Sequence, residues 1–396
     1  MVELLAPAGD FEALEAALMY GADAVYLGGP QLQLRAKRTA FDETGLQKAV
    51  AMAHEKGKKV YVTVNAFAYD DEIDRMADYA RYLFDIGADA AIVGDIGILC
   101  AIKDAAPELA VHVSTQANCM NARAARAYWD MGAARVVLSR EVSLEQIAEL
   151  HSRIPAQLEL EAFVHGAMCM AYSGRCIISS YLAGRSGNRG LCAQPCRWNY
   201  VLLEEKRPGE YIPIEENDAG TQILSSHDLC MIDYVKQLEA AGVCSFKIEG
   251  RMKSAYYTAT VTNAYRRAID ETAGLDFCRG ELSSIRHRPY STGFYFRELA
   301  QNHAHDPADQ FECVFAAKVL SCEYGTATIQ QRGNFAVGDV LETIAREGDT
   351  KKIPVTALIN EEGQSQPNAP HPMQVLKMPC DCVLTAGEFL RKRVEK

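Results

Sequence analysis

Four segments in the first part of the chain share one pattern of polar and apolar positions: a glycine, a small or polar step, and then an apolar run rich in β-branched residues. They are GADAVYLGG from Gly21, GADAAIVGD from Gly87, GAARVVLSR from Gly132 and GVCSFKIEG from Gly242. A glycine in the left-handed conformation ends many helices, and a continuous apolar run is typical of a buried parallel strand. Each segment therefore predicts the end of a helix followed by a strand.

Further β-rich runs and amphipathic stretches lie between these segments. The runs are VELLA at the start, KKVYVTVNAF from Lys58, AVHVSTQA from Ala110 and QLELEAFVHG from Gln157. Stretches such as FEALEAALMY and LEQIAELHSRI carry apolar residues at helical spacing. Eight alternating strands and helices predict a closed (β/α)8 TIM-like barrel over residues 1–300. A doubly wound open sheet is less favoured, because the first strand is followed by Ala-Pro-Ala-Gly-Asp and not by a glycine fingerprint.

The pattern changes in residues 301–396. FECVFAAKVLSCEYGTATIQQRGNFAVGDVLETI alternates β-branched and polar residues between glycine turns, and KKIPVTALI and MQVLKM continue the alternation. Alternation with a period of two is typical of strands with one buried face. These residues therefore predict a second domain, a small antiparallel β-barrel.

Composition and charge limit the class of protein. The chain has 396 residues, of which 48% are hydrophobic and 23% are charged, as in ordinary globular proteins. MVELLAPAGD has no secretion signal, and no window is apolar enough to cross a membrane, so we expect a soluble cytoplasmic protein. The net charge of −11 disfavours indiscriminate binding to nucleic acid. Thirteen cysteines in such a chain favour metal binding or catalysis over a disulfide framework.

Barrel enzymes of this class carry their chemistry where the strands end. The polar residues at the predicted ends outline a pocket: Asp10, Asn65, Gln116, Arg140, Glu141, Glu161, His165, Glu249 and Arg251. We predict that catalysis involves Glu161, His165 and Glu249. We predict substrate binding by Asn65, Gln116, Arg140, Lys247, Arg251 and Lys253, the last two holding a carboxylate or phosphate. For any one of these residues, a helix cap or a polar layer inside the barrel is an equally good interpretation.

The longest excursion, residues 166–242, follows the predicted seventh strand and so lies on the catalytic face. It contains Cys169, Cys176, Cys192 and Cys196 at spacings C-x6-C and C-x3-C, and Cys230 follows later. Thiolates select zinc, copper(I) or iron-sulfur centres, and these spacings are looser than the C-x2-C pairs of structural zinc sites. The pattern predicts a metal site, in the first place an iron-sulfur cluster, with zinc as the alternative. Buried thiols are less favoured for four cysteines within 28 residues.

The same excursion is basic and aromatic. Residues 166–203 contain no Asp or Glu. They carry Arg175, Arg185, Arg189 and Arg197, interleaved with Tyr172, Tyr181, Trp198 and Tyr200. Arginine binds phosphate and aromatic rings stack on bases, so the segment predicts binding of single-stranded RNA through Arg185, Arg189, Arg197 and Trp198. A solvated charged face and a site for a small dicarboxylate are the alternatives.

ELEAFVHGAMCMAYSGRCIISSYLAGRSGNRGLCAQPCRW, followed by FKIEGRMKS, resembles the collagenase-like peptidase family U32. The resemblance implies a 4Fe-4S cluster on Cys169, Cys176, Cys192 and Cys196, although some relatives draw a ligand from the position of Cys230. The length, the GNRGLCAQPCRW segment and the appended domain are most similar to members that form 5-hydroxyuridine at the tRNA wobble position using prephenate. Other members hydroxylate a cytidine of 23S rRNA or ubiquinone precursors. A homo-oligomer, or a hetero-oligomer with a related family member, is a further expectation.

Three classes of function remain as hypotheses. A tRNA uridine hydroxylase ranks first, because the chain combines a redox-capable cysteine set with an anion-binding surface and stacking aromatics. A collagenase-like peptidase ranks second, since the sequence has no H-E-x-x-H, no G-x-S-x-G and no cysteine with an obvious base partner. An RNA-binding module without catalysis ranks third, because the polar barrel mouth would then have no use.

Overall fold

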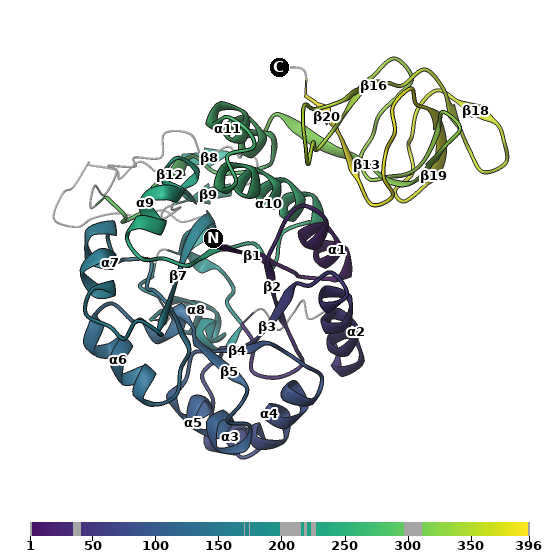
Figure 1. Cartoon of the computed structure of the whole chain (residues 1–396). Helices are drawn as coiled ribbons and strands as arrows, with labels where there is room; N and C mark the ends of the chain where they lie inside the picture. The colour runs from purple at the N-terminus through teal and green to yellow at the C-terminus, as the bar shows by residue number, and fades with distance from the viewer. Residues whose placement is uncertain are drawn as a thin grey trace.

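Eight parallel strands form a closed barrel in the computed structural model of the chain (Figure 1). The structure describes residues 2–34, 41–169, 171–173, 175–198, 215–217, 220–222, 227–296 and 311–394. Strands β1 to β7 pair in sequence order, and β11 pairs with both β7 and β1, which closes the ring. The barrel strands are β1 (Glu3–Pro7), β2 (Ala24–Gly28), β3 (Lys59–Val64), β4 (Ala90–Val93), β5 (Ala110–Val113), β6 (Arg135–Val137), β7 (Glu159–Ala167) and β11 (Ser245–Ile248). The predicted TIM-like barrel is confirmed.

Glycines end four barrel helices where the repeated sequence pattern predicts them. Gly21, Gly87, Gly132 and Gly242 have φ angles of 102°, 79°, 95° and 96°. Residues with a side chain rarely adopt such angles, so glycine is needed at these turns. The helices that they follow are α1 (Phe11–Met19), α4 (Met76–Asp85), α6 (Ala122–Asp130) and α9 (Val235–Ala240).

Short polar side chains begin several helices. Asp10 caps α1 by accepting a hydrogen bond from the backbone N of Ala13 at 2.8 Å. Asp95 and Ser254 cap two later helices in the same way. Such caps contribute about 1 kcal/mol each. A helix cap, the alternative interpretation of Asp10, is therefore what the structure shows.

A layer of helices surrounds the barrel (Figure 1). The main apolar core lies between these helices and the strands, whereas alternate residues of the first four strands, such as Leu5, Tyr26 and Tyr61, fill the barrel interior. The remaining helices are α2 (Glu43–His54), α3 (Asp70–Ile73), α5 (Ile96–Ala105), α7 (Leu144–His151), α10 (Ala255–Ile269) and α11 (Leu275–Ser284). In the described part of the chain, no helix has both the length and the hydropathy of a membrane span.

The described parts of the excursion after β7 form short elements. Its β10 runs antiparallel to the end of β7, β12 pairs with β10, and β8 and β9 form a separate two-stranded sheet. The bounds are α8 (Ile178–Ala183), η3 (Gly187–Arg189), η4 (Pro195–Arg197), β8 (Glu215–Asn217), β9 (Gly220–Gln222), β10 (Asp228–Cys230), η5 (Ile232–Tyr234) and β12 (Tyr290–Ser291), with η2 (Thr115–Ala117) after β5. The predicted cysteine-bearing insertion after the seventh strand is therefore present.

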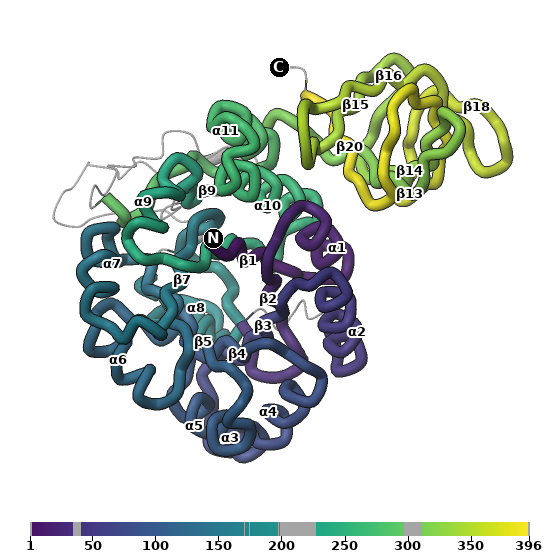
Figure 2. The backbone as a smooth tube through the Cα atoms, viewed as in Figure 1, coloured from purple at the N-terminus to yellow at the C-terminus, as the bar shows by residue number. Residues whose placement is uncertain are grey.

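The C-terminal domain is a curled antiparallel sheet with its own apolar core, as the alternating sequence predicts. Figure 2 shows this domain beside α10 and α11. The strand order is β16-β15-β20-β13-β14-β19-β17-β18. The strands are β13 (Cys313–Glu323), β14 (Thr326–Gln331), β15 (Val340–Thr343), β16 (Lys352–Pro354), β17 (Leu358–Ile359), β18 (Ser365–Gln366), β19 (Val375–Pro379) and β20 (Phe389–Arg393).

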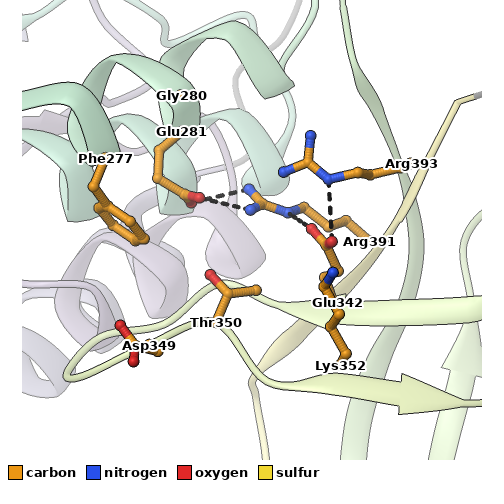
Figure 3. Close-up of a pocket in the computed structure, with 9 residues that line it drawn as sticks. All are labelled: Phe277, Gly280, Glu281, Glu342, Asp349, Thr350, Lys352, Arg391 and Arg393. Carbon is orange, nitrogen blue, oxygen red and sulfur yellow. Dashed lines mark hydrogen bonds and ion pairs between the residues drawn. The ribbon is translucent and has the colours of Figure 1, made fainter.

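The C-terminal sheet packs against the barrel domain through α1, α10 and α11. The backbone N of Phe389 donates to Tyr20 Oη at 3.1 Å, and the rings of Tyr256 and Phe315 stack at 5.2 Å. A cavity of about 380 Å³ lies in this interface (Figure 3). Beside it, Arg391 reaches from β20 to Glu281 of α11, with nitrogen-to-oxygen distances of 2.6 and 2.9 Å. This buried ion pair links the two domains.

Candidate functional site

Two charged side chains meet at the carboxyl end of the barrel. Arg140 follows β6 and Glu249 follows β11, and Arg140 Nη2 lies 3.0 Å from Glu249 Oε2. Arg140 Nη1 donates to the carbonyl of Ala167 at 2.7 Å, and the guanidinium lies 3.9 Å from the ring centroid of Phe163. The two charged side chains are 14% and 24% exposed, so a ligand that enters the barrel mouth has access to them.

Arg251 occupies another part of the mouth, over the ends of β2 and β3. Its Nη1 donates a hydrogen bond to Thr63 Oγ1, and that hydroxyl donates to the carbonyl of Leu27 at 3.1 Å. A Cβ at Gly28 would lie only 2.9 Å from Arg251 Nη1. Glycine at the end of β2 therefore makes room for the arginine side chain.

Asn65 and Gln116 both lie against Gly94, after β3 and β5. A Cβ at Gly94 would lie 2.7 Å from the carbonyl O of Asn65 and 3.1 Å from Cβ of Gln116. Asn65 Oδ1 also accepts a hydrogen bond from the backbone N of Leu34 at 3.2 Å. We call Asn65, Gln116, Arg140, Glu249 and Arg251 the mouth residues. These five residues, which the sequence predicted at strand ends, therefore lie at the carboxyl end of the barrel.

Glu161 and Lys247 do not lie at the mouth, where the sequence predicted them. Each is the third residue of its strand, in β7 and β11, and points into the barrel interior. Lys247 Nζ lies 2.7 Å from Glu161 Oε1, and Arg135 Nη1 lies 3.1 Å from Glu161 Oε2. The prediction that Glu161 ends a strand is wrong because β7 continues to Ala167. Glu161 is 0% exposed, and two cations hold its carboxylate in place.

His165 was also expected at the mouth but lies on the outer side of the strands. A β-bulge between Lys247 and Ile248 shifts the pairing, so that His165 pairs with Ile248. Its ring then packs against the rings of Tyr257, Tyr265 and Tyr290. Burial lowers the pKa of His165 to about 3, so the imidazole is neutral at pH 7. This position does not face the mouth residues.

Contacts near the start of the excursion and further along it fasten its described part over the barrel. Near its start, Ser173 donates through its backbone N to Glu141 Oε1 at 2.9 Å. Further along, Arg189 makes a two-point ion pair with Glu72, with distances of 2.9 and 2.8 Å, and its guanidinium lies over the ring of Tyr69. The hydrogen bond from Arg189 lowers the pKa of Glu72. Glu141 and Arg189 therefore hold the excursion against the ends of β6 and β3.

Replacing Arg189 with alanine should loosen the excursion. A partly exposed two-point pair contributes about 1 kcal/mol, which corresponds to a roughly fivefold higher population of the open form. We therefore expect chymotrypsin to cleave after Tyr181 about five times faster in R189A under native conditions. Arg185→Ala removes an arginine from the same segment without breaking the pair with Glu72 and serves as the control. Equal cleavage rates for both variants would contradict the anchoring role.

The other residues predicted to contact RNA differ in accessibility. Trp198 is 41% exposed and donates through Nε1 to the carbonyl of Ala193 at 3.2 Å, while Tyr181 is 86% exposed. Arg185 is partly exposed, and Lys253 is exposed beside Tyr257. The side chain of Arg197 and all of Tyr200 lie outside the described residues. Because Arg189 is held by Glu72, it is less available for phosphate than the sequence predicted.

Cys169, Cys176, Cys192 and Cys196, the predicted metal-binding cysteines, are not joined in disulfide bonds. Cys169 and Cys192 are exposed, and Cys176 and Cys196 are partly exposed. The backbone N of Gln194 donates to the sulfur of Cys192 at 3.4 Å. Within the described residues, however, no three His, Cys, Asp or Glu side chains are grouped closely enough to hold a metal ion. The geometry does not fit a preformed cluster, and the cluster stays a prediction.

Residues 9–305 match the model of peptidase family U32, and residues 312–391 match the model of the peptidase family U32 C-terminal domain. The chain belongs to peptidase family U32. Among its curated relatives, tRNA hydroxylation protein P of Escherichia coli is 35% identical and tRNA hydroxylation protein P1 of Bacillus subtilis is 34% identical. These matches cover 93% and 98% of this chain, and 91% and 94% of the relatives. A 23S rRNA 5-hydroxycytidine synthase of Escherichia coli is 38% identical over 68% of this chain and 39% of the relative.

The name of the U32 family raises the question whether the chain has a peptidase site. The candidate pair is Cys230 and His165, which lie opposite each other on the neighbouring strands β10 and β7. Tyr265 Oη lies 3.4 Å from His165 Nδ1 and 4.0 Å from Cys230 Sγ. Burial raises the pKa of Cys230 to about 11, whereas burial lowers the pKa of His165 to about 3. A cysteine nucleophile needs a thiolate beside a basic histidine. This pair is neutral at pH 7 and does not have that character. Cys230 also faces away from the barrel interior, together with His165.

Sequence reasoning missed several residues of this U32 member that position the site. Phe163 supports the guanidinium of Arg140, Thr63 accepts from Arg251, and Glu72 holds the excursion. Arg135, which lies at the other end of the barrel from the mouth residues, was also missed, although a charged residue that starts an otherwise apolar strand is a visible signal. The other three gave no signal, because each acts on a partner that is distant in sequence.

Proposed function

We propose that this U32 protein is a tRNA-modifying hydroxylase that forms 5-hydroxyuridine at the wobble position, with prephenate as co-substrate. The similarity to tRNA hydroxylation proteins along nearly the whole chain carries the proposal. The rRNA hydroxycytidine synthase supports it, because its name describes the same kind of change on another pyrimidine of RNA. The barrel mouth is where the reaction would take place.

The mouth residues suit a flipped nucleotide and an anionic co-substrate. An enzyme that acts on a base carbon must take the base out of its stack, which requires an open pocket. Arg140 and Arg251 supply two guanidinium groups at the mouth, where they would bind phosphate or carboxylate oxygens. Glu249 lies beside Arg140 and would accept a proton from the substrate. The exposed rings of Tyr181 and Trp198 are available for stacking.

A 4Fe-4S cluster on Cys169, Cys176, Cys192 and Cys196 is part of the proposal. Such a cluster would supply electron transfer next to the barrel mouth. The backbone N–H that donates to Cys192 Sγ is compatible with it, since hydrogen bonds to the cysteine sulfurs tune these clusters. Because the described cysteine side chains do not lie close enough together to hold a metal, binding of the cluster would have to rearrange the excursion. Iron analysis and absorption at roughly 400 nm distinguish this cluster from zinc.

The test is nucleoside analysis of tRNA by mass spectrometry. The chain is expressed in a bacterial strain that lacks its own tRNA hydroxylation proteins, and 5-hydroxyuridine should reappear. In the same strain without prephenate synthesis, the nucleoside should stay low. A chain that leaves tRNA unchanged but cleaves gelatin above a mock purification would support the peptidase alternative instead. Binding of tRNA without modification or cleavage would favour the RNA-binding module.

Arg140→Ala should reduce formation of the modified nucleoside. A charge-assisted hydrogen bond contributes about 1.5–3 kcal/mol, so the rate should fall by about 10- to 100-fold. The matched control is Arg153→Ala, which removes an exposed arginine next to α7 that pairs with Glu149. If R140A folds normally and forms the modified nucleoside at the normal rate, Arg140 does not take part in the reaction.

A further inference from the structure

Three cysteines lie at one end of the C-terminal sheet, in a domain separate from the excursion. Cys322 belongs to β13, Cys380 directly follows β19, and Cys382 lies two residues further on. The sulfur atoms of Cys380 and Cys382 are 3.4 Å apart. Cys322 Sγ lies 3.7 Å from the carbonyl O of Cys382. None of these cysteines takes part in the proposed tRNA reaction.

The chain holds Cys380 and Cys382 in different environments. Cys380 is 3% exposed, its backbone N donates to the carbonyl of Gly325 at 2.9 Å, and its thiol donates to the carbonyl of Cys382 at 3.1 Å. Cys382 is partly exposed, and the next residue, Val383, is 81% exposed. One thiol of the pair is therefore fixed and buried, while the other is open to reagents in solution.

We propose that Cys380 and Cys382 form a reversible intramolecular disulfide, which makes this turn an oxidation-sensitive site. The two sulfurs would have to approach by about 1.4 Å to reach the S–S bond length of about 2.0 Å. Cys380 and Cys382 are two residues apart in one turn, and rotation about their side-chain bonds would bring the sulfurs closer. The site stands on the C-terminal domain alone and does not depend on the proposed function.

A small disulfide such as oxidised glutathione is the oxidant that balances the reaction. The Cys382 thiolate attacks it, forms a mixed disulfide and releases one glutathione thiolate, which takes up a proton. Cys380 then loses its proton and attacks the sulfur of Cys382, which releases the second glutathione. Two protein thiols are oxidised and one glutathione disulfide is reduced to two thiols. Burial raises the pKa of Cys380 to about 12, which favours Cys382 as the first nucleophile.

Peptide mass spectrometry tests the proposal on the full-length protein. The reduced chain is incubated with excess oxidised glutathione, alkylated during denaturation and digested with trypsin. Cleavage after Lys377 and Arg391 releases residues 378–391, which contain Cys380 and Cys382 and no other cysteine. We expect this peptide to lose about 2 mass units, for two hydrogens, and to escape alkylation. Addition of dithiothreitol should restore two alkylation sites.

Two variants identify the pair. Cys322→Ser should leave the loss of about 2 mass units unchanged, whereas Cys382→Ser should abolish it. The proposal is overturned if residues 378–391 of the wild type remain alkylated at both cysteines after oxidation. It is also overturned if Cys322, on the peptide of residues 319–332, becomes linked to Cys380 or Cys382 instead.

Discussion

Replacing Arg391 with alanine should lower the free energy of unfolding by about 3–5 kcal/mol, because it leaves a buried carboxylate without its cation. Arg391 is 1% exposed and Glu281 is 4% exposed, and two hydrogen bonds join them across the domain interface. Arg391 also donates to Ser284 Oγ at 3.0 Å. Equilibrium unfolding in urea measures the change as a shift of the midpoint.

Arg393→Ala is the matched control for R391A, since Arg393 lies two residues away on the same strand and also pairs with Glu342 (Figure 3). Its side chain is 54% exposed. Exposed ion pairs contribute about 0–1 kcal/mol, so R393A should shift the midpoint little. Equal shifts for both variants would show that the ion pair with Glu281 does not hold the domains together.

The barrel was predictable because its signals are local. A glycine with positive φ and an apolar run recur at each of four helix-to-strand junctions, and both features depend on neighbouring residues only. The second domain was predictable for the same reason, since alternation with a period of two follows from strand geometry. Helix caps such as Asp10 were ambiguous, because the same residue type serves in caps and in active sites.

The mouth was predictable only where a strand ended as the sequence indicated. Arg140, Glu249 and Arg251 follow short strands within three residues of the strand end, and all three lie at the carboxyl end of the barrel. Glu161 lies in the interior because β7 has nine residues and continues well beyond it. His165 lies outside because a bulge reverses the alternation, and bulges leave no reliable trace in a single sequence.

The basic excursion shows that the composition of a segment does not reveal whether its arginines are available to bind phosphate. A segment without acidic residues appears free to bind phosphate, yet Arg189 pairs with Glu72, which lies more than a hundred positions earlier in the chain. Phosphate binding depends on the net charge of all residues that lie near the arginine in the fold, including residues that are distant in sequence. Arg185 and Trp198 remain the better candidates of this segment for RNA contacts, because they are partly exposed.

A network of buried charges closes the opposite end of the barrel from the mouth. Arg135 lies at its centre, 4% exposed, and contacts the carboxylates of Glu3, Glu159 and Glu161. Tyr61 Oη donates to Glu3 Oε2 at 2.6 Å. Burial alone would raise the pKa of Glu3, but the hydrogen bond and charge of Arg135 outweigh it, so the pKa of Glu3 is lowered. Arg135 therefore favours the ionised form of Glu3.

Arg135→Met should lower the free energy of unfolding by about 3–5 kcal/mol at about pH 7, because Glu3 and Glu161 are left with less positive charge. In the wild type, the lowered pKa of Glu3 means that stability is lost as the pH falls through that pKa. In R135M, burial without the cation raises the pKa of Glu3 above its value in the unfolded chain. The folded state then binds a proton at a higher pH than the unfolded state does, so lowering the pH stabilises the folded state of R135M. The difference between the two proteins should therefore shrink from about pH 7 to about pH 5.

Urea unfolding at both pH values measures this convergence of R135M and the wild type. Glu159→Gln is the control, since Glu159 is 49% exposed and also pairs with Arg135. Its loss should change stability by about 1 kcal/mol or less at either pH. A difference between R135M and the wild type that stays constant with pH would mean that lost packing causes the destabilisation. If instead it shrinks as expected, the guanidinium of Arg135 acts through the ionisation of Glu3.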